Sequence, residues 1–200
     1  MIIELYGLPG SGKTTLFKRF SSCKDFKLVR IENNLELTFF SLLSFLRHPL
    51  IFLHTFYLIT VNSNNWRMFY YKFMNVLFHR SAKYMKASFY KRSVIDECFF
   101  QNILSIYEKE ITKIDLYKIT QLLPKPDTLV VFNVDVSVLK ERTKKDAVRR
   151  DFGDEYYAKW KEVIYKNNEL FIDELDNLYI SYTLISNQED FDTIIEKYEK

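Results

Sequence analysis

The chain is poor in cysteine, proline and glycine, and these shortages exclude whole classes of protein. Its 200 residues include only two cysteines, four prolines and four glycines. The cysteines, Cys23 and Cys98, are far apart and form no CxxC pair, which excludes a disulfide scaffold and is typical of a reduced, cytoplasmic protein. Nearly half of the residues are hydrophobic, with 18 Phe and 14 Tyr, so the composition is not that of a disordered chain.

A strong excess of one charge is also missing. The chain has 29 Lys and Arg against 26 Asp and Glu, a net charge of +3, which is too small to indicate a nucleic-acid partner. The length fits one domain, residues 1–200, that buries about 70% of the surface of its unfolded chain. Because the sequence begins directly on an apolar run, we expect no signal peptide and a cytoplasmic location.

No uninterrupted apolar run is long enough to span a membrane. The most apolar region, residues 35–61, is interrupted by Arg47, His48, Pro49 and His54. A spanning helix needs about 20 mostly apolar residues. We therefore expect no transmembrane segment, but two short buried helices that meet at Pro49, since the residue before a proline disfavours helix. Peripheral contact with a membrane remains an alternative.

Three of the four glycines fall within one short motif. Residues 7–14 read Gly-Leu-Pro-Gly-Ser-Gly-Lys-Thr, which matches the G-x-x-x-x-G-K-[ST] phosphate-binding loop, the Walker A motif. An apolar, β-prone run at residues 1–6 precedes it, and apolar residues at helical spacing follow over residues 14–20. Strand, loop and helix therefore stand in the order that the motif requires.

This motif predicts a nucleotide site. Its glycines let backbone N–H groups approach phosphate oxygens, and the helix that follows adds its positive N-terminal end. Lys13 is expected at the β- and γ-phosphates, and the hydroxyl of Thr14 is expected to hold Mg²⁺. We predict ATP and Mg²⁺ as cofactors, with the nucleotide bound by Gly7, Pro9, Gly10, Ser11, Gly12, Lys13, Thr14 and Thr15.

A second informative stretch is the short apolar strand at residues 93–95, which ends in Asp96 and Glu97. In P-loop folds a neighbouring parallel strand brings an acid beside Mg²⁺ and the γ-phosphate, at the edge of the sheet where ligands bind. We therefore predict that Asp96 is catalytic, either as a proton acceptor or as a metal ligand. Glu97 and Gln101 are candidates for contact with the phosphoryl acceptor.

A basic segment, residues 140–153, follows the strongly apolar strand at residues 128–134. Arg142 and Arg149 are seven residues apart and share one face if the helix continues. Guanidinium groups suit a phosphoryl group in transfer, so we predict both arginines as catalytic. An ordinary basic surface helix is the alternative.

One motif is interpreted as a coincidence. Residues 112–115 read Thr-Lys-Ile-Asp, which imitates the T-K-x-D guanine-reading motif of GTPases. That motif follows an apolar strand, whereas the charged pattern of residues 107–110 precedes it here. The D-x-x-G motif of GTPases is missing as well, because Asp96 is followed by Glu97, Cys98 and Phe99.

Apolar strands alternate with helices along the chain, which predicts a three-layer α/β/α domain around a parallel sheet. The five strands are expected near residues 2–6, 27–31, 93–96, 128–134 and 180–185. With these features the chain resembles the P-loop kinases of the nucleotide-kinase superfamily, thymidylate and deoxynucleoside kinases in particular. The resemblance rests on the stretches at residues 7–14, 94–97 and 131–142 and on the basic segment through residue 150.

The resemblance implies strand order 2-3-1-4-5, a helical insert at residues 35–92 that binds the acceptor, and a basic lid at residues 140–153 over the phosphates. Asp96 matches the acid that begins D-R-Y in thymidylate kinases or E-R-S in deoxynucleoside kinases, but Glu97 replaces the arginine that follows. The long aromatic insert also departs from those families. Most of its cations, from Arg67 to Arg92, are expected on a solvated face, and one or two could meet an anionic substrate.

We therefore expect an ATP-dependent kinase, a phosphotransferase that acts on a small-molecule acceptor of nucleoside, nucleotide or sugar type. The alternatives are an ATPase or a nucleotide-binding regulatory module that acts on a protein partner. The sequence leaves open the acceptor, GTP in place of ATP, and a homodimer.

Overall fold

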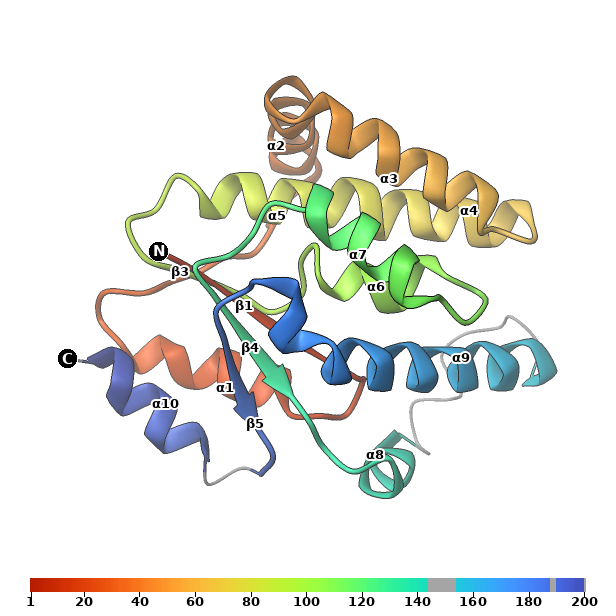
Figure 1. The fold of residues 1–200 in the computed structure, drawn as a ribbon. Helices are drawn as coiled ribbons and strands as arrows, with labels where there is room; N and C mark the ends of the chain where they lie inside the picture. The colour runs from red at the N-terminus through yellow and green to blue at the C-terminus, as the bar shows by residue number, and fades with distance from the viewer. Residues whose placement is uncertain (144–153, 188–189, 200) are drawn as a thin grey trace.

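The core of the protein is a parallel sheet with strand order β2-β3-β1-β4-β5, as predicted (Figure 1). The computed structural model describes residues 1–143, 154–187 and 190–199. The strands are β1 (Ile2–Gly7), β2 (Lys27–Leu28), β3 (Ser93–Ile95), β4 (Thr128–Phe132) and β5 (Tyr182–Ile185). The first strand of the chain is central in the sheet, since Ile3 pairs with Val94 of β3 and with Thr128 of β4.

Helices cover both faces of this sheet and complete the three-layer α/β/α P-loop fold (Figure 1). The helices before β3 are α1 (Lys13–Arg19), η1 (Phe20–Ser22), α2 (Asn34–Arg47), α3 (Pro49–Val61), α4 (Trp66–Lys72), the π-helical η2 (Phe73–His79) and α5 (Arg80–Ala87). Those after β3 are α6 (Gln101–Ile106), α7 (Lys113–Leu122), α8 (Val136–Thr143), α9 (Asp154–Asp173), η4 (Leu175–Leu178) and α10 (Asp190–Glu199).

Successive side chains of β1 point to opposite faces of the sheet, and the hydrophobic core forms one cluster on each face. Ile3 and Leu5 face one side, where they pack with side chains of α1 and α10. Tyr6 faces the other side, where it stacks on Phe171 of α9 with ring centroids 4.2 Å apart. The central strands β1, β3 and β4 are buried along nearly their whole length, so their residues are mostly apolar rather than alternately polar.

The insert between β2 and β3 forms a separate layer beside the sheet. Helices α4, η2 and α5 follow one another without a break from Trp66 to Ala87, α2 packs on α5, and α3 packs on η2. The prediction of two helices that meet at Pro49 is confirmed, since Pro49 is the first residue of α3. The prediction that both are buried is wrong, because each packs on one side only and its outer face lies open.

The membrane expectation can be compared with these helices. Within the described part of the chain, no single helix is both long and apolar enough to cross a bilayer. Helices α2 and α3 reach that length and composition only as a pair, and the chain bends by 109° between them.

One local prediction needs correction. Residues 27–31 were expected to form a strand, but only Lys27 and Leu28 do so, because this edge strand has β3 alone as a partner. The N-terminal cap of the next element, α2, is Asn33, whose side chain accepts a hydrogen bond from the backbone N–H of Glu36 at 2.9 Å. The shortened strand differs from the prediction at its end, where sequence patterns are least informative.

The T-K-x-D stretch has a structural role at the start of α7. The hydroxyl of Thr112 accepts a hydrogen bond from the backbone N–H of Asp115, and the carboxylate of Asp115 accepts one from the backbone N–H of Thr112. This reciprocal pair is a capping box, which satisfies two backbone donors at a helix start. The stretch is thus explained without a guanine base.

We expect Thr112→Ala to lower the free energy of unfolding by about 1 kcal/mol, because it removes the cap of α7. Urea denaturation measures this loss, and Thr112→Ser is the matched control that keeps the hydroxyl. The affinity for ATP is expected to be the same in wild type, Thr112→Ala and Thr112→Ser, and so is the affinity for GTP. Selective loss of GTP binding in the alanine variant would contradict the capping role.

Candidate active site

The P-loop joins the carboxyl end of β1 to α1, and its path depends on glycine at two positions. A Cβ at Gly7 would lie 2.8 Å from Cβ of Phe132, so β1 and β4 approach too closely for a side chain there. Gly12 precedes α1 with φ of +103°, a left-handed conformation that L side chains rarely adopt. These positions hold the loop in a single compact path at the edge of the sheet.

Lys13 places a buried positive charge inside this loop. Its ammonium donates hydrogen bonds to the carbonyl oxygens of Gly7 at 2.6 Å and Leu8 at 3.0 Å. Burial lowers the pKa of Lys13 to about 8, although the nearby carboxylates of Glu97 and Asp96 act in the opposite direction. A buried ammonium held by neutral carbonyls fits an anionic partner, which would compensate its lost hydration.

Other groups of the loop also fit a phosphate. The hydroxyl of Ser11 is buried and has no hydrogen-bond partner among the described residues. Thr14 and Thr15 are exposed in the first turn of α1, as are Pro9 and Gly10 in the loop. An unpaired buried donor beside a buried ammonium is what a phosphate-binding loop offers before its ligand arrives.

Beneath the loop, Glu4 and Gln101 connect β1 to the start of α6. One carboxylate oxygen of Glu4 accepts hydrogen bonds from the backbone N–H groups of Phe100 at 2.8 Å and Gln101 at 3.3 Å. The side-chain oxygen of Gln101 accepts a hydrogen bond from the backbone N–H of Gly7 at 3.1 Å. The predicted contact of Gln101 with the acceptor stays a prediction, and in the structure its side-chain oxygen supports the P-loop backbone.

Glu4 is fully buried, and burial raises its pKa to about 8. The hydrogen bonds from Phe100 and Gln101 lower the pKa only in part. Its second oxygen and the hydroxyl of Tyr6 have no partner within the described residues. At neutral pH this carboxyl group therefore keeps a proton that an exposed glutamate has lost.

Asp96 lies at the carboxyl end of β3, the strand that pairs with β1. Its carboxylate accepts a hydrogen bond from the ammonium of Lys83 at 2.7 Å, and the two side chains are 28% and 20% exposed. Lys83 belongs to α5, so the insert supplies a cation directly to the predicted catalytic acid.

Arg80, one turn before Lys83, contacts Glu97 and the start of α6. Its guanidinium donates hydrogen bonds to the side-chain oxygen of Asn102 at 2.6 Å and to the hydroxyl of Ser105 at 3.1 Å, and it lies 3.7 Å from the carboxylate of Glu97. Arg80 is buried, whereas Glu97 is half exposed. The acids that follow β3 thus face two cations of α5.

The insert's cations were expected mostly on a solvated face, and for several of them this is wrong. Lys72 is fully buried in an ion pair with Glu108, and burial lowers its pKa. Arg80, Lys83 and Lys86 also turn inward, Lys86 onto Glu36 at 2.5 Å. Sequence analysis missed the roles of Arg80, Lys83 and Glu4. The recurrence of cations at every third position from residue 80 to 86 was the available signal for one shared helix face.

Arg142 brings α8 to the P-loop. Its guanidinium donates a hydrogen bond to the carbonyl oxygen of Gly10 at 3.3 Å, although the side chain is exposed. Of the predicted lid at residues 140–153, only residues 140–143 belong to the described structure. Arg149 lies outside the described residues, so its assignment to the site stays a prediction.

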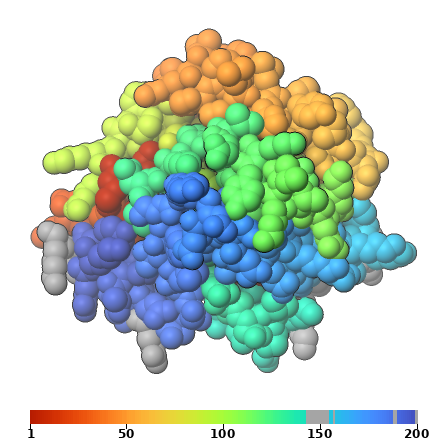
Figure 2. Space-filling model, in the orientation of Figure 1, coloured from red at the N-terminus to blue at the C-terminus, as the bar shows by residue number. Residues whose placement is uncertain are grey.

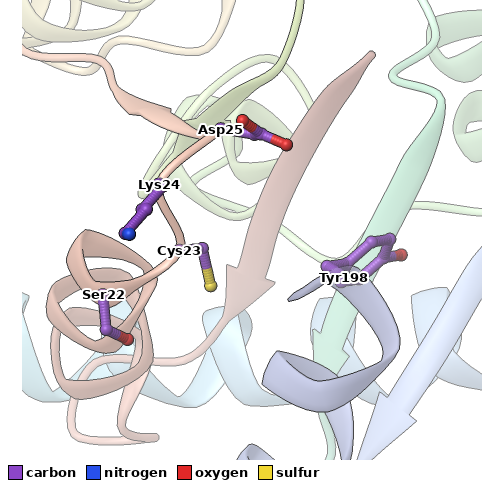
Figure 3. A pocket seen from close by; sticks show the side chains of 5 residues that line it. All are labelled: Ser22, Cys23, Lys24, Asp25 and Tyr198. Atoms are coloured by element: carbon purple, nitrogen blue, oxygen red, sulfur yellow. The ribbon is translucent and has the colours of Figure 1, made fainter. Parts of the chain in front are cut away.

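A separate pocket of about 410 Å³ is lined by none of these groups (Figure 3). It is lined by Ser22, Cys23, Lys24, Asp25 and Tyr198, which come from the segment before β2 and from the end of α10. Because residues before a strand lie at the amino end of a parallel sheet, this pocket is at the edge opposite the P-loop.

Comparison with known proteins shows the fold. No family model and no curated protein sequence matches the chain. Among solved structures, deoxyadenosine kinase from M. mycoides with bound dATP is similar over all of both chains, with a TM-score of 0.53 and 16% identity. The same enzyme with the products dCMP and a flexible dCDP bound has a TM-score of 0.51 and 20% identity, over 98% of this chain and 96% of that one. This chain therefore has the fold of a deoxynucleoside-kinase-like P-loop kinase.

The buried carboxyl group of Glu4 predicts an unusual pH dependence of stability. Its pKa is about 8 in the folded chain and its ordinary value is 4.5, so unfolding releases a proton between these limits. The free energy of unfolding therefore decreases as pH rises from 5 to 8, by at most about 1.4 kcal/mol per pH unit from this group.

We expect Glu4→Gln to remove this decrease, which urea denaturation at several pH values measures. The difference from the wild-type chain isolates Glu4, because the histidines titrate in both proteins. Glu36→Gln is the control, since an ion pair with Lys86 lowers the pKa of Glu36 and keeps its titration below this window. Parallel pH curves for wild type and Glu4→Gln would contradict the assignment.

Proposed function

We propose that this chain is a kinase that transfers a phosphoryl group from ATP to a nucleoside or nucleotide. The observation that carries the proposal is that the P-loop and Asp96 lie side by side at the carboxyl ends of neighbouring strands. The P-loop follows β1, Asp96 follows β3, and these strands are paired neighbours. The fold shared with deoxyadenosine kinase over the whole chain supports the same reading.

In this proposal the P-loop holds the phosphates of ATP. Its backbone N–H groups and the ammonium of Lys13 face the phosphate oxygens, and Arg142 stands beside the loop at Gly10. Thr14 and Asp96 are the residues that would hold Mg²⁺, which supplies neutralising charge to the phosphates when bound. Phosphoryl transfer is catalysed mainly by such positioning and electrostatic stabilisation.

Asp96 is the proposed proton acceptor when the phosphoryl acceptor is a hydroxyl group. The ammonium of Lys83, 2.7 Å away, fixes the orientation of the carboxylate. Arg80 holds the start of α6 and lies beside Glu97, so positive charge stands next to the acids on the insert side. In this proposal the acceptor would lie between the P-loop and the insert helix α5.

One observation favours a second candidate, an ATPase that acts on a protein partner. Glu97 is a half-exposed carboxylate directly after Asp96, a position from which it could orient a water molecule. The guanidinium of Arg80 attracts the same carboxylate, so it competes with such a water molecule for Glu97. Dependence of turnover on an acceptor separates the two functions.

The first test measures ATP and GTP consumption with Mg²⁺ across nucleosides, deoxynucleosides, nucleoside monophosphates and sugars, with water-only controls. We expect turnover to rise sharply with a nucleoside or nucleotide acceptor, and Lys13→Ala to abolish it because the phosphates lose their buried cation. Slow hydrolysis that is equal with every acceptor would favour the ATPase.

The second test separates Asp96 from Glu97. We expect Asp96→Asn to lower kcat by about 10²- to 10⁴-fold, the usual contribution of a positioned acid or base, with a smaller change in ATP affinity. Glu97→Gln is the matched control and is expected to keep most of the activity. Equal kcat in wild type and Asp96→Asn would remove Asp96 from the chemistry.

A further inference from the structure

The outer faces of α2 and α3 carry an unusually large apolar surface, which we call the α2–α3 ridge. Its side chains are 40–85% exposed. They are Leu35, Phe39, Leu42, Leu46, Leu50, Leu53, Phe56, Tyr57 and Val61. At these fractions such side chains expose on the order of 100 Å² each. The ridge therefore exceeds the apolar patch of about 300–600 Å² found on an ordinary monomer.

The ridge forms one side of the molecule. Helix α2 packs on α5 through residues such as Leu37, and α3 packs on η2, where Phe52 meets Phe78 with ring centroids 6.0 Å apart. Both helices pack on the continuous helical segment formed by α4, η2 and α5. Their outer faces therefore point away from the rest of the protein. Figure 2 shows these segments, in brown and orange, as an uncovered crest at the top of the molecule.

The charge of this region has one sign. Residues 37–95 contain eight Lys and Arg, all three His of the chain, and no Asp or Glu. The rest of the chain has the opposite balance, with 21 Lys and Arg against 26 Asp and Glu. The ridge from Phe39 to Val61 lies within this acid-free stretch of 59 residues, so no carboxylate belongs to that part of the ridge.

Several of these cations pair with carboxylates of the protein, among them Lys72, Lys83 and Lys86. Arg47, at the end of α2 and beside the ridge, is exposed. Trp66 at the start of α4 is amphipathic and 77% exposed. Apolar side chains flanked by cations and by exposed Trp and Tyr are typical of helices that lie in a membrane interface.

We propose that the α2–α3 ridge docks on the surface of a bilayer that contains anionic lipid. The apolar side chains would enter the boundary between headgroups and acyl chains, and Arg47 would meet lipid phosphates. Two helices that meet at 109° define a plane, so both can lie flat on the surface. This proposal is independent of the kinase assignment.

Charge complementarity favours a lipid surface over a second copy of the chain. A second copy of the ridge offers Arg47 no carboxylate from residues 37–95, and Glu36 at the start of its α2 is already paired with Lys86. An anionic membrane supplies the missing negative charge, worth about a fivefold gain in binding for each cation near the surface.

The test is flotation of the full chain with vesicles of phosphatidylcholine, with or without phosphatidylglycerol. We expect flotation with the mixed vesicles, much less with phosphatidylcholine alone, and a decrease as NaCl screens the cations. Emission of Trp66 is expected to shift to shorter wavelength on the mixed vesicles, and Trp66→Phe removes this shift.

Variants assign the binding to the ridge. Phe39→Ser, Leu42→Ser and Leu46→Ser together are expected to weaken binding at least tenfold, because three exposed apolar groups no longer leave water. Arg47→Gln is expected to weaken it about fivefold. The matched control combines Ile114→Ser with Leu184→Ser, exposed apolar residues outside the insert, and is expected to bind as wild type. All of these side chains are exposed, and thermal unfolding checks that each variant folds.

The proposal is overturned if the chain floats with neither vesicle or if the triple variant floats like wild type. A dimer in solution that the triple variant dissociates, together with no flotation, would assign the ridge to a second copy. Acceptor-dependent kinase activity without lipid is expected to be unchanged in the triple variant, so failure of the membrane proposal and failure of the kinase proposal are distinguishable.

Discussion

The buried carboxyl group of Glu4 is the connection on which the site depends. It accepts hydrogen bonds from the backbone N–H groups of Phe100 and Gln101 at the start of α6. The side-chain oxygen of Gln101 in turn accepts a hydrogen bond from the backbone N–H of Gly7. The P-loop is thus fixed to the segment that follows Asp96 through side chains that water does not reach. A loop that must approach phosphates closely gains precision from such support, because each member of a buried hydrogen-bonded network restricts the others.

Local pattern was enough to predict much of the fold and the phosphate loop. The motif at residues 7–14 carries its own geometry in its glycines, and the apolar strand at residues 128–134 is readable because a central parallel strand has no polar face. The roles of Glu4 and Lys83 could not be predicted in this way. Glu4 meets Phe100 across 96 positions, and Lys83 meets Asp96 only after α5 has packed beside β3. A contact set by tertiary packing leaves little trace in the neighbouring sequence.

The insert illustrates why burial was misjudged there. Apolar runs such as residues 50–53 normally indicate a core, and that inference assumes that something covers them. Here α2 and α3 form an outermost layer that packs on one side, while buried cations such as Lys72 occupy positions that the sequence marks as polar. The insert therefore departs from the usual distribution in two places, because the cations of α5 and Lys72 turn inward to acids and the outer faces of α2 and α3 expose apolar side chains.

The central position of β1 has a consequence for folding during synthesis on the ribosome. β1 is made first, but its neighbours β3 and β4 follow about 90 and 125 residues later in the chain. At a synthesis rate of about 5–20 residues per second, the strand leaves the ribosome on the order of ten seconds before β4 can join it. Until β3 has been made, the apolar residues of β1 have no strand to pair with, so the nascent chain first carries its P-loop on an unpaired strand.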